Sequence, residues 1–118
     1  MSAVLVSRAM ERASLPRELR PFVDDAGRLV SWPARFKVQR KAAALLALRF
    51  EAGREYGEKD VNALLMDGHT FGDWALLRRT LVDLGFMARE SSGARYWVHA
   101  DAARLIAEQL PASDLPNA

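Results

Sequence analysis

The sequence lacks cysteine altogether, and its 118 residues include only two histidines. The absence of cysteine excludes disulfides, thiolate zinc sites, iron–sulfur clusters and cysteine nucleophiles. Long hydrophobic runs are also missing, since no stretch approaches the roughly 20 apolar residues that a membrane-spanning helix needs. Arg8 interrupts the apolar N-terminal stretch too early for a secretory signal. We therefore expect a cytoplasmic protein without membrane contact.

Neither sign of charge is in large excess, because 17 Lys and Arg face 15 Asp and Glu and leave a net charge of +2. Half of the residues are hydrophobic, so we expect one domain that buries roughly two-thirds of its surface without a disulfide or metal. The charges are unevenly placed, and no acid occurs between Ala26 and Phe50. A basic middle of this kind is compatible with nucleic-acid binding. Its six cations are Arg28, Arg35, Lys37, Arg40, Lys41 and Arg49.

Apolar residues at the 3.6-residue spacing predict five helices, over residues 2–13, about 36–51, about 58–66, 70–84 and 101–110. Thr70 is the predicted N-cap of the fourth of these, and Gly85 follows its last turn. Two short runs, 86–90 and 94–98, are rich in aromatic and β-branched residues and flank Ser91-Ser92-Gly93. That pattern predicts a β-hairpin.

The order of three helices followed by a hairpin predicts a mainly α protein with a winged helix-turn-helix-like core. The first and last helices flank that core. We divide the chain into an N-terminal helix and linker (1–32), a winged-helix-like domain (33–99) and a C-terminal helix with a frayed tail (100–118). A small α+β domain that shares this order is the alternative.

The apolar faces of the predicted elements define one expected core. Tyr96 and Trp97 alternate in a strand, so one of them enters the core and the other faces outward. The remaining predicted core residues are Leu45, Leu48, Val61, Leu64, Leu65, Trp74, Leu77, Leu81 and Leu84.

Several short motifs are spread over the basic middle, the following helices and the hairpin. They are Gly27-Arg28-Leu29, Pro33 with the basic residues after it, Phe50-Glu51-Ala52-Gly53-Arg54-Glu55-Tyr56, Glu58-Lys59-Asp60-Val61-Asn62, His69, Leu77-Arg78-Arg79, Leu81-Val82-Asp83, Gly85 and Tyr96-Trp97. In this combination, over roughly residues 27–98, the chain resembles the domain of unknown function 2087 family, an uncharacterised bacterial family. The resemblance implies a winged-helix fold and a regulatory setting, because members occur alone or fused to helix-turn-helix transcriptional regulators. Gly57 departs from the pattern, since a Ser or Thr cap is usual there.

The sequence offers few candidate catalytic residues and few candidate metal ligands. The serines lie in turns or ends without a nucleophile-elbow motif, and no Gly-rich phosphate loop is present. His69 and Asp73 are four residues apart, but a structural zinc site needs four ligands and His99 is distant. We therefore predict no enzyme activity, no cofactor and no metal, and interpret His69 as a loop or capping residue.

The basic side chains are the candidate functional residues, as contacts to nucleic-acid phosphates. Arg79 is predicted to point outward from the helix over 70–84, beside Leu76, Val82 and Asp83, which is poor material for reading bases. The alternatives are an Arg79–Asp83 ion pair within the helix and, for the other cations, a solvated surface. The candidates are Arg35, Lys37, Arg40, Lys41, Arg79, Arg89 and Arg95.

Two function classes follow. The first is a winged-helix module of a transcriptional regulator that binds double-stranded DNA mainly through its phosphates. The second is a protein-interaction or ligand-sensing module of the same fold without DNA binding, to which the apolar residues on the outer helix face are suited. The flanking helices predict a homodimer, the commonest closed oligomer, and a regulator protein is a further expected partner.

Overall fold

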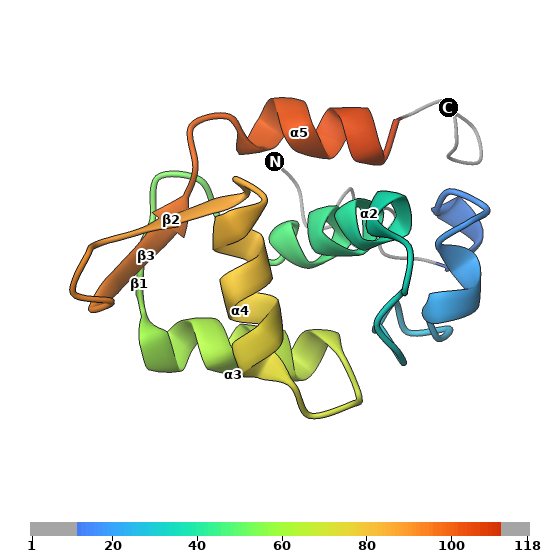
Figure 1. Cartoon of the computed structure of the whole chain (residues 1–118), viewed down its shortest axis with the longest axis horizontal. Coiled ribbons are helices and arrows are strands. Elements are labelled where there is room, and N and C mark those ends of the chain that lie inside the picture. The colour runs from blue at the N-terminus through green and yellow to red at the C-terminus, as the bar shows by residue number, and fades with distance from the viewer. Residues whose placement is uncertain (1–11, 112–118) are drawn as a thin grey trace.

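The computed structural model describes residues 12–111, which form four α-helices and a small sheet at one edge of the molecule (Figure 1). In chain order, the elements are the 3₁₀ helices η1 (Arg12–Ser14) and η2 (Arg20–Phe22), helix α2 (Phe36–Ala47), strand β1 (Glu55–Gly57), helices α3 (Glu58–Gly68) and α4 (Trp74–Asp83), strands β2 (Met87–Arg89) and β3 (Arg95–Val98), and helix α5 (Ala102–Gln109). The predicted mainly α class with a small β part is confirmed, and the order is consistent with a winged-helix-like arrangement. Among the described residues, every helix is too short or too polar to span a bilayer.

The sheet has three strands, whereas the sequence patterns predict only a hairpin. The hairpin of β2 and β3 is confirmed, with Gly93 at a φ of 77° in its turn. Strand β3 also pairs antiparallel with β1, which places Tyr56 opposite Tyr96. The prediction missed β1 because three residues give no periodic signal and its partner strand lies far along the chain.

The ends of α4 follow from local hydrogen bonds. The predicted N-cap at Thr70 is wrong, because Asp73 accepts the backbone N–H of Leu76 at 3.3 Å and is the N-cap. The predicted end at Gly85 is confirmed, and Gly85 has a φ of 86°. There, the N–H of Phe86 donates to the carbonyl of Leu81 at 2.9 Å, a Schellman pattern that ends the helix.

The core brings together α2, α3, α4 and the inner face of the sheet. Leu77 and Leu81 are fully buried one turn apart on α4, and Tyr96 rather than Trp97 enters the core. The placement of Trp74 in the core is wrong, because it lies at the first position of α4 and keeps 37% of its surface exposed. Of the other predicted core residues, Leu45, Val61 and Leu65 are buried, and Leu48, Leu64 and Leu84 are partly buried against the core.

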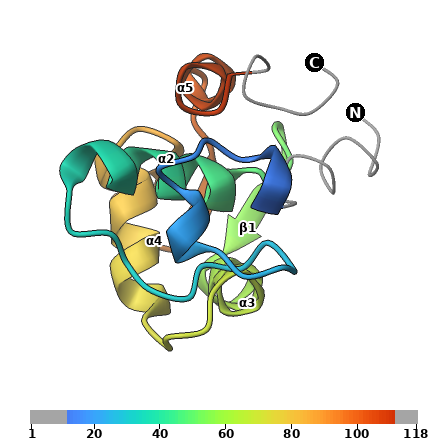
Figure 2. The same ribbon diagram turned by 90° about the vertical axis from the view of Figure 1, so that its right-hand side faces the viewer.

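The segments on either side of the helix–sheet unit pack onto it. Figures 1 and 2 show α5 along one side of α2, with α3 on the opposite side of the molecule. On α5, Ala102 is buried and Ala103 is exposed. Before α2, the buried Leu29 donates its N–H to the carbonyl of Gly68 at 3.0 Å. Leu15, Leu19 and Val23 join the same core.

Two predicted helices differ in extent from the structure. The helix predicted over 36–51 ends at Ala47, and turns follow it. The helix predicted over 2–13 lies outside the described residues except for its last two, which belong to η1.

Candidate nucleic-acid interface

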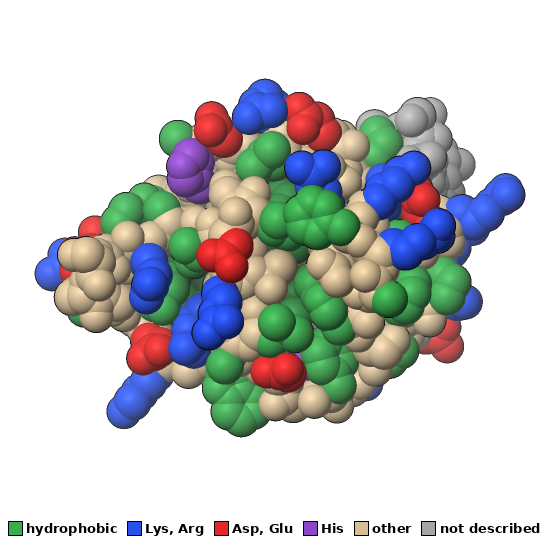
Figure 3. All heavy atoms as spheres, viewed as in Figure 1, with side chains coloured by type: hydrophobic (Ala, Val, Ile, Leu, Met, Phe, Trp, Pro, Cys, Tyr) green, Lys and Arg blue, Asp and Glu red, His purple; other side chains and the backbone are tan. Residues whose placement is uncertain are grey.

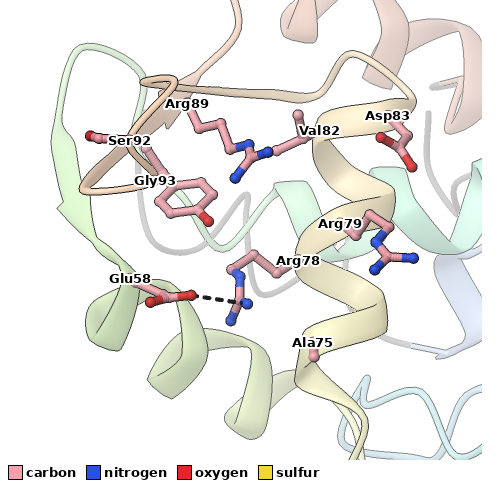
Figure 4. A pocket seen from close by; sticks show the side chains of 10 residues that line it. Glu58, Ala75, Arg78, Arg79, Val82, Asp83, Arg89, Ser92 and Gly93 are labelled. Carbon is pink, nitrogen blue, oxygen red and sulfur yellow. Dashed lines mark ion pairs between the residues drawn. The ribbon is translucent and has the colours of Figure 1, made fainter.

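Helices α3 and α4 and the hairpin of β2 and β3 enclose a surface cleft of about 380 Å³. Arg78, Arg79 and Arg89 line it together with the acids Glu58 and Asp83. Figure 4 shows that these side chains come from all three elements. Three cations against two anions give the cleft a positive balance, and we call it the arginine cleft.

The position of the buried side of α4 determines where its two arginines point. Leu77 is fully buried, and each following residue is rotated by about 100° around the helix axis. Arg78 is therefore at the edge of the core face and partly buried, while Arg79 is exposed, as the helical pattern predicts. The ion pair between Arg79 and Asp83 does not form, because no acid lies within 4.0 Å of Arg79 among the described residues.

Arg78 is held by α3 at the edge of the cleft. Its Nη2 lies 3.0 Å from Oε1 of Glu58, and its Nη1 donates to Oδ1 of Asn62. Figure 4 shows the Arg78 side chain directed toward Glu58, whereas Arg79 points away from it. Arg78 therefore ties α4 to the first turns of α3 and keeps its charge at the cleft edge.

Arg89 reaches the cleft from the hairpin. It lies opposite Tyr96 in the β2–β3 register, so both side chains are on the same face of the sheet. Tyr96 is buried and lines the cleft, which fixes that face as the inner one. In Figure 4, the guanidinium of Arg89 extends toward Val82 on α4. No acid of the described residues lies within 4.0 Å of Arg89.

Arg95 lies on the opposite face of the hairpin from Arg89. It precedes Tyr96 in β3, and successive strand residues point to opposite faces. Its guanidinium lies 3.4 Å from Glu55 and 3.8 Å from Glu90, so two carboxylates neutralise it. Both Arg89 and Arg95 are candidate phosphate contacts in the sequence analysis, but the structure brings only Arg89 into the cleft.

The four predicted cations at the start of α2 form a separate group. Figure 3 shows Lys and Arg side chains near the hairpin at one end of the viewed face and near α2 at the other, with hydrophobic side chains between them. Arg35 and Lys37 are exposed, and Arg40 lies over the ring of Phe36 at 5.1 Å. The ammonium of Lys41 lies 3.6 Å from Glu18 and donates to the carbonyl of Gln109. Lys41 thus already has two partners within the fold.

His69 is a capping residue, as the sequence analysis predicts. It is buried, its Nδ1 bonds the carbonyl of Leu65, and its Nε2 accepts the N–H of Asp73 at 2.9 Å. These bonds require the neutral tautomer with hydrogen on Nδ1. The imidazole therefore joins the end of α3 to the start of α4. Across residues 12–111, no three His, Asp or Glu side chains gather as metal ligands would.

Sequence reasoning missed Glu58 and Asn62 as members of the site. In the sequence, both residues stand out only as parts of the motif Glu58-Lys59-Asp60-Val61-Asn62, which predicts no role for either in the site. Their partner Arg78 is 16 positions from Asn62, so no pattern within one helix connects them. The available signal was the spacing itself, since Glu58 and Asn62 are one helical turn apart and share a face of α3.

The comparisons with known proteins concern the whole of this helix–sheet unit. A family model described as an uncharacterized protein conserved in bacteria (DUF2087) matches residues 28–98. That range includes α2, the sheet, α3 and α4, and all residues of the arginine cleft. No curated protein and no solved structure matches the chain.

Proposed function

The chain belongs to the DUF2087 family of bacterial proteins, and from the geometry of its arginine cleft we propose that it is a winged-helix DNA-binding module of a transcriptional regulator. One observation carries the proposal. Arg79 on α4 and Arg89 on the hairpin are exposed, lack an acidic partner among the described residues, and line the same cleft.

The two arginines suit the backbone of double-stranded DNA. A guanidinium binds phosphate oxygens bidentately, and two of them on separate elements can contact successive phosphates. On the cleft side, α4 contributes Ala75, Arg78, Arg79, Val82 and Asp83. The major groove of B-DNA admits an α-helix, so this side of α4 can lie in it. Arg35, Lys37 and Arg40 are further phosphate contacts in this proposal, whereas Lys41 and Arg95 contribute less because acids already pair with them.

Binding is expected to be weak and mainly independent of sequence. The net charge is only +2, and Asp83 lines the cleft beside the arginines. Phosphate contacts supply most non-specific affinity, for which dissociation constants of roughly 10⁻⁴–10⁻⁶ M at physiological salt are typical. Each neutralised phosphate releases condensed counterions, so the affinity should fall steeply as salt rises.

The test is a salt titration of binding to a fluorescent DNA duplex, followed by anisotropy. We expect the log–log slope of the Arg79→Ala/Arg89→Ala variant to be less negative than that of the wild type by about 1.8, which corresponds to two phosphate contacts. Arg104→Ala is the control, because Arg104 is an exposed arginine on α5, away from the cleft. It should change the slope little.

A wild-type protein without salt-dependent binding at low ionic strength would exclude the DNA function. The second candidate, a protein-interaction module, would then take its place. A specific observation favours that candidate, since Phe36 and Trp74 keep 57% and 37% of their surfaces exposed. Large exposed apolar side chains are typical of contact surfaces. The homodimer and the regulator partner stay predictions.

A further inference from the structure

The arginine cleft contains an anion of the protein's own. Glu58 lies 3.0 Å from Arg78 at the cleft edge, and both line the cavity (Figure 4). A carboxylate bound by a guanidinium presents the same charge and similar oxygen geometry as a phosphate. Glu58 is therefore already paired with Arg78, one of the three arginines that a DNA phosphate would otherwise contact.

Asn62 holds the same guanidinium from a second direction. It accepts from Nη1, while Glu58 engages Nη2. The Arg78 side chain is only 21% exposed. Folding therefore already fixes most of its conformation before any ligand binds. If Glu58 leaves, Asn62 keeps Nη1 in place, and Nη2 is free to donate toward the cleft.

Glu58 can leave at little cost. Its side chain is 51% exposed at the first position of α3, so the carboxylate can turn into water without being buried elsewhere. While it stays, it also repels an incoming phosphate. We propose that Glu58 weakens phosphate binding in the cleft by holding Arg78, and that Asn62 is the positioning residue that keeps Arg78 aimed. This inference rests on the proposed function, in which the cleft binds DNA.

The experiment compares Glu58→Gln with Glu108→Gln in the same salt titration on duplex DNA. The two glutamates are matched, because Glu108 is 52% exposed and lies 2.9 Å from Arg104 on α5. Both changes add one unit to the net charge. Glu58→Gln frees a phosphate contact, so its slope should be more negative by about 0.9 and its affinity roughly fivefold to tenfold higher at 0.1 M salt. Glu108→Gln should change the affinity less than twofold.

A second arm tests whether the higher DNA affinity of Glu58→Gln depends on Arg78. The gain from Glu58→Gln should disappear when it is combined with Arg78→Ala, because no guanidinium is then freed. A gain that persists without Arg78, or an equal gain in Glu108→Gln, would overturn the inference while leaving the DNA function standing. Thermal melting confirms that each variant folds. Should Glu58→Gln not fold, Glu58→Asp, whose shorter side chain loosens the pair, should give a smaller gain of the same kind.

The third arm does not depend on DNA. Inorganic pyrophosphate is titrated into wild type and Glu58→Gln while the Arg78 Nε–H signal is followed by NMR. Tighter pyrophosphate binding by Glu58→Gln supports the inference even if neither protein binds DNA, an outcome that rejects the proposed function alone. Equal pyrophosphate affinity of the two proteins would overturn the inference. If Glu58→Gln binds DNA and wild type does not, the inference is supported.

Discussion

The stretch from residue 26 to residue 50 carries six cations and no acid, whereas the three arginines of the cleft are interspersed with acids along the chain. In space, acids neutralise the cations of the basic stretch at least as much as those of the cleft. Acids from outside the stretch pair with half of its cations: Arg28 with Asp24 at 3.0 Å, Lys41 with Glu18 at 3.6 Å, and Arg49 with Asp67 at 2.9 Å. Of the three cleft arginines, only Arg78 pairs with an acid, Glu58 at 3.0 Å, and Arg79 and Arg89 have no such partner in the described part of the chain.

The difference shows that charge density along a sequence does not measure the field at a surface. Coulombic interactions depend on distance in space, and a carboxylate a few ångströms away neutralises a cation wherever it lies in the chain. Within residues 12–111, no acid lies within 4.0 Å of the three other cations of the basic stretch, Arg35, Lys37 and Arg40. Arg40 lies against Phe36, and an interaction with that ring competes with phosphate for its charge.

The largest expected effect concerns the packing that creates the cleft. Leu77→Ala removes a fully buried side chain from the core side of α4, and should lower the free energy of unfolding by about 2–5 kcal/mol. Without that packing, α4 no longer sets the spacing of Arg78 and Arg79 from the hairpin. Chemical denaturation measures the loss.

Trp74→Ala is the matched control on the same helix. Because Trp74 is 37% exposed, its truncation should cost clearly less than that of Leu77, although tryptophan is the larger side chain. Losses below 1 kcal/mol in both Leu77→Ala and Leu81→Ala would contradict the packing described above.

The next effect concerns whether Arg79 contacts DNA bases as well as phosphates. If α4 lies in the major groove, Arg79 meets base edges as well as phosphates, and a bidentate contact to guanine is worth about 1–3 kcal/mol of discrimination. Arg79→Ala should then change the order of preference among duplexes in a competition assay. An unchanged order would restrict Arg79 to the DNA backbone.

A smaller effect is expected from the start of α2. Arg40→Ala/Lys41→Ala should make the salt slope less negative without changing sequence preference, because phosphate contacts carry little sequence information. The change should be smaller than that of Arg79→Ala/Arg89→Ala, since Lys41 is held by Glu18 and Gln109. Anisotropy titrations on one duplex compare the two double variants directly. A larger change in the α2 variant would make that region the main interface.

The smallest effect concerns the ion pair that neutralises Arg28. The backbone N–H of Arg28 and its positive charge hold the pKa of Asp24 below its ordinary value of 3.8. A carboxyl with a lowered pKa in the folded state stabilises the fold above the unfolded-state pKa, and that contribution is lost as the pH falls through the folded-state value. Asp24→Asn should therefore lower the melting temperature slightly at pH 6 and have a smaller effect near pH 3. Asp25→Asn, at the exposed neighbouring position, is the control.

Local patterns were sufficient for most of the fold. The buried pair Leu77 and Leu81, the glycine end of α4 at Gly85 and the β2–β3 turn at Gly93 each depend on residues within a few positions of one another. The outward direction of Arg79 follows from the same helical period. These features are determined by the sequence because side-chain periodicity and glycine conformation are short-range properties.

Other features were decided by contacts between distant residues. Strand β1 exists because Tyr56 meets Tyr96, and the exposure of Trp74 reflects that no other element covers the first turn of α4 on that side among the described residues. The site shows the same division. The sequence was sufficient to identify Arg79 and Arg89 as candidate cations. It did not predict that Glu58, Glu18 and Asp24 pair with other cations of the chain. Which arginines remain available to a ligand is fixed by folding, because desolvation and ion pairing act through space and not along the chain.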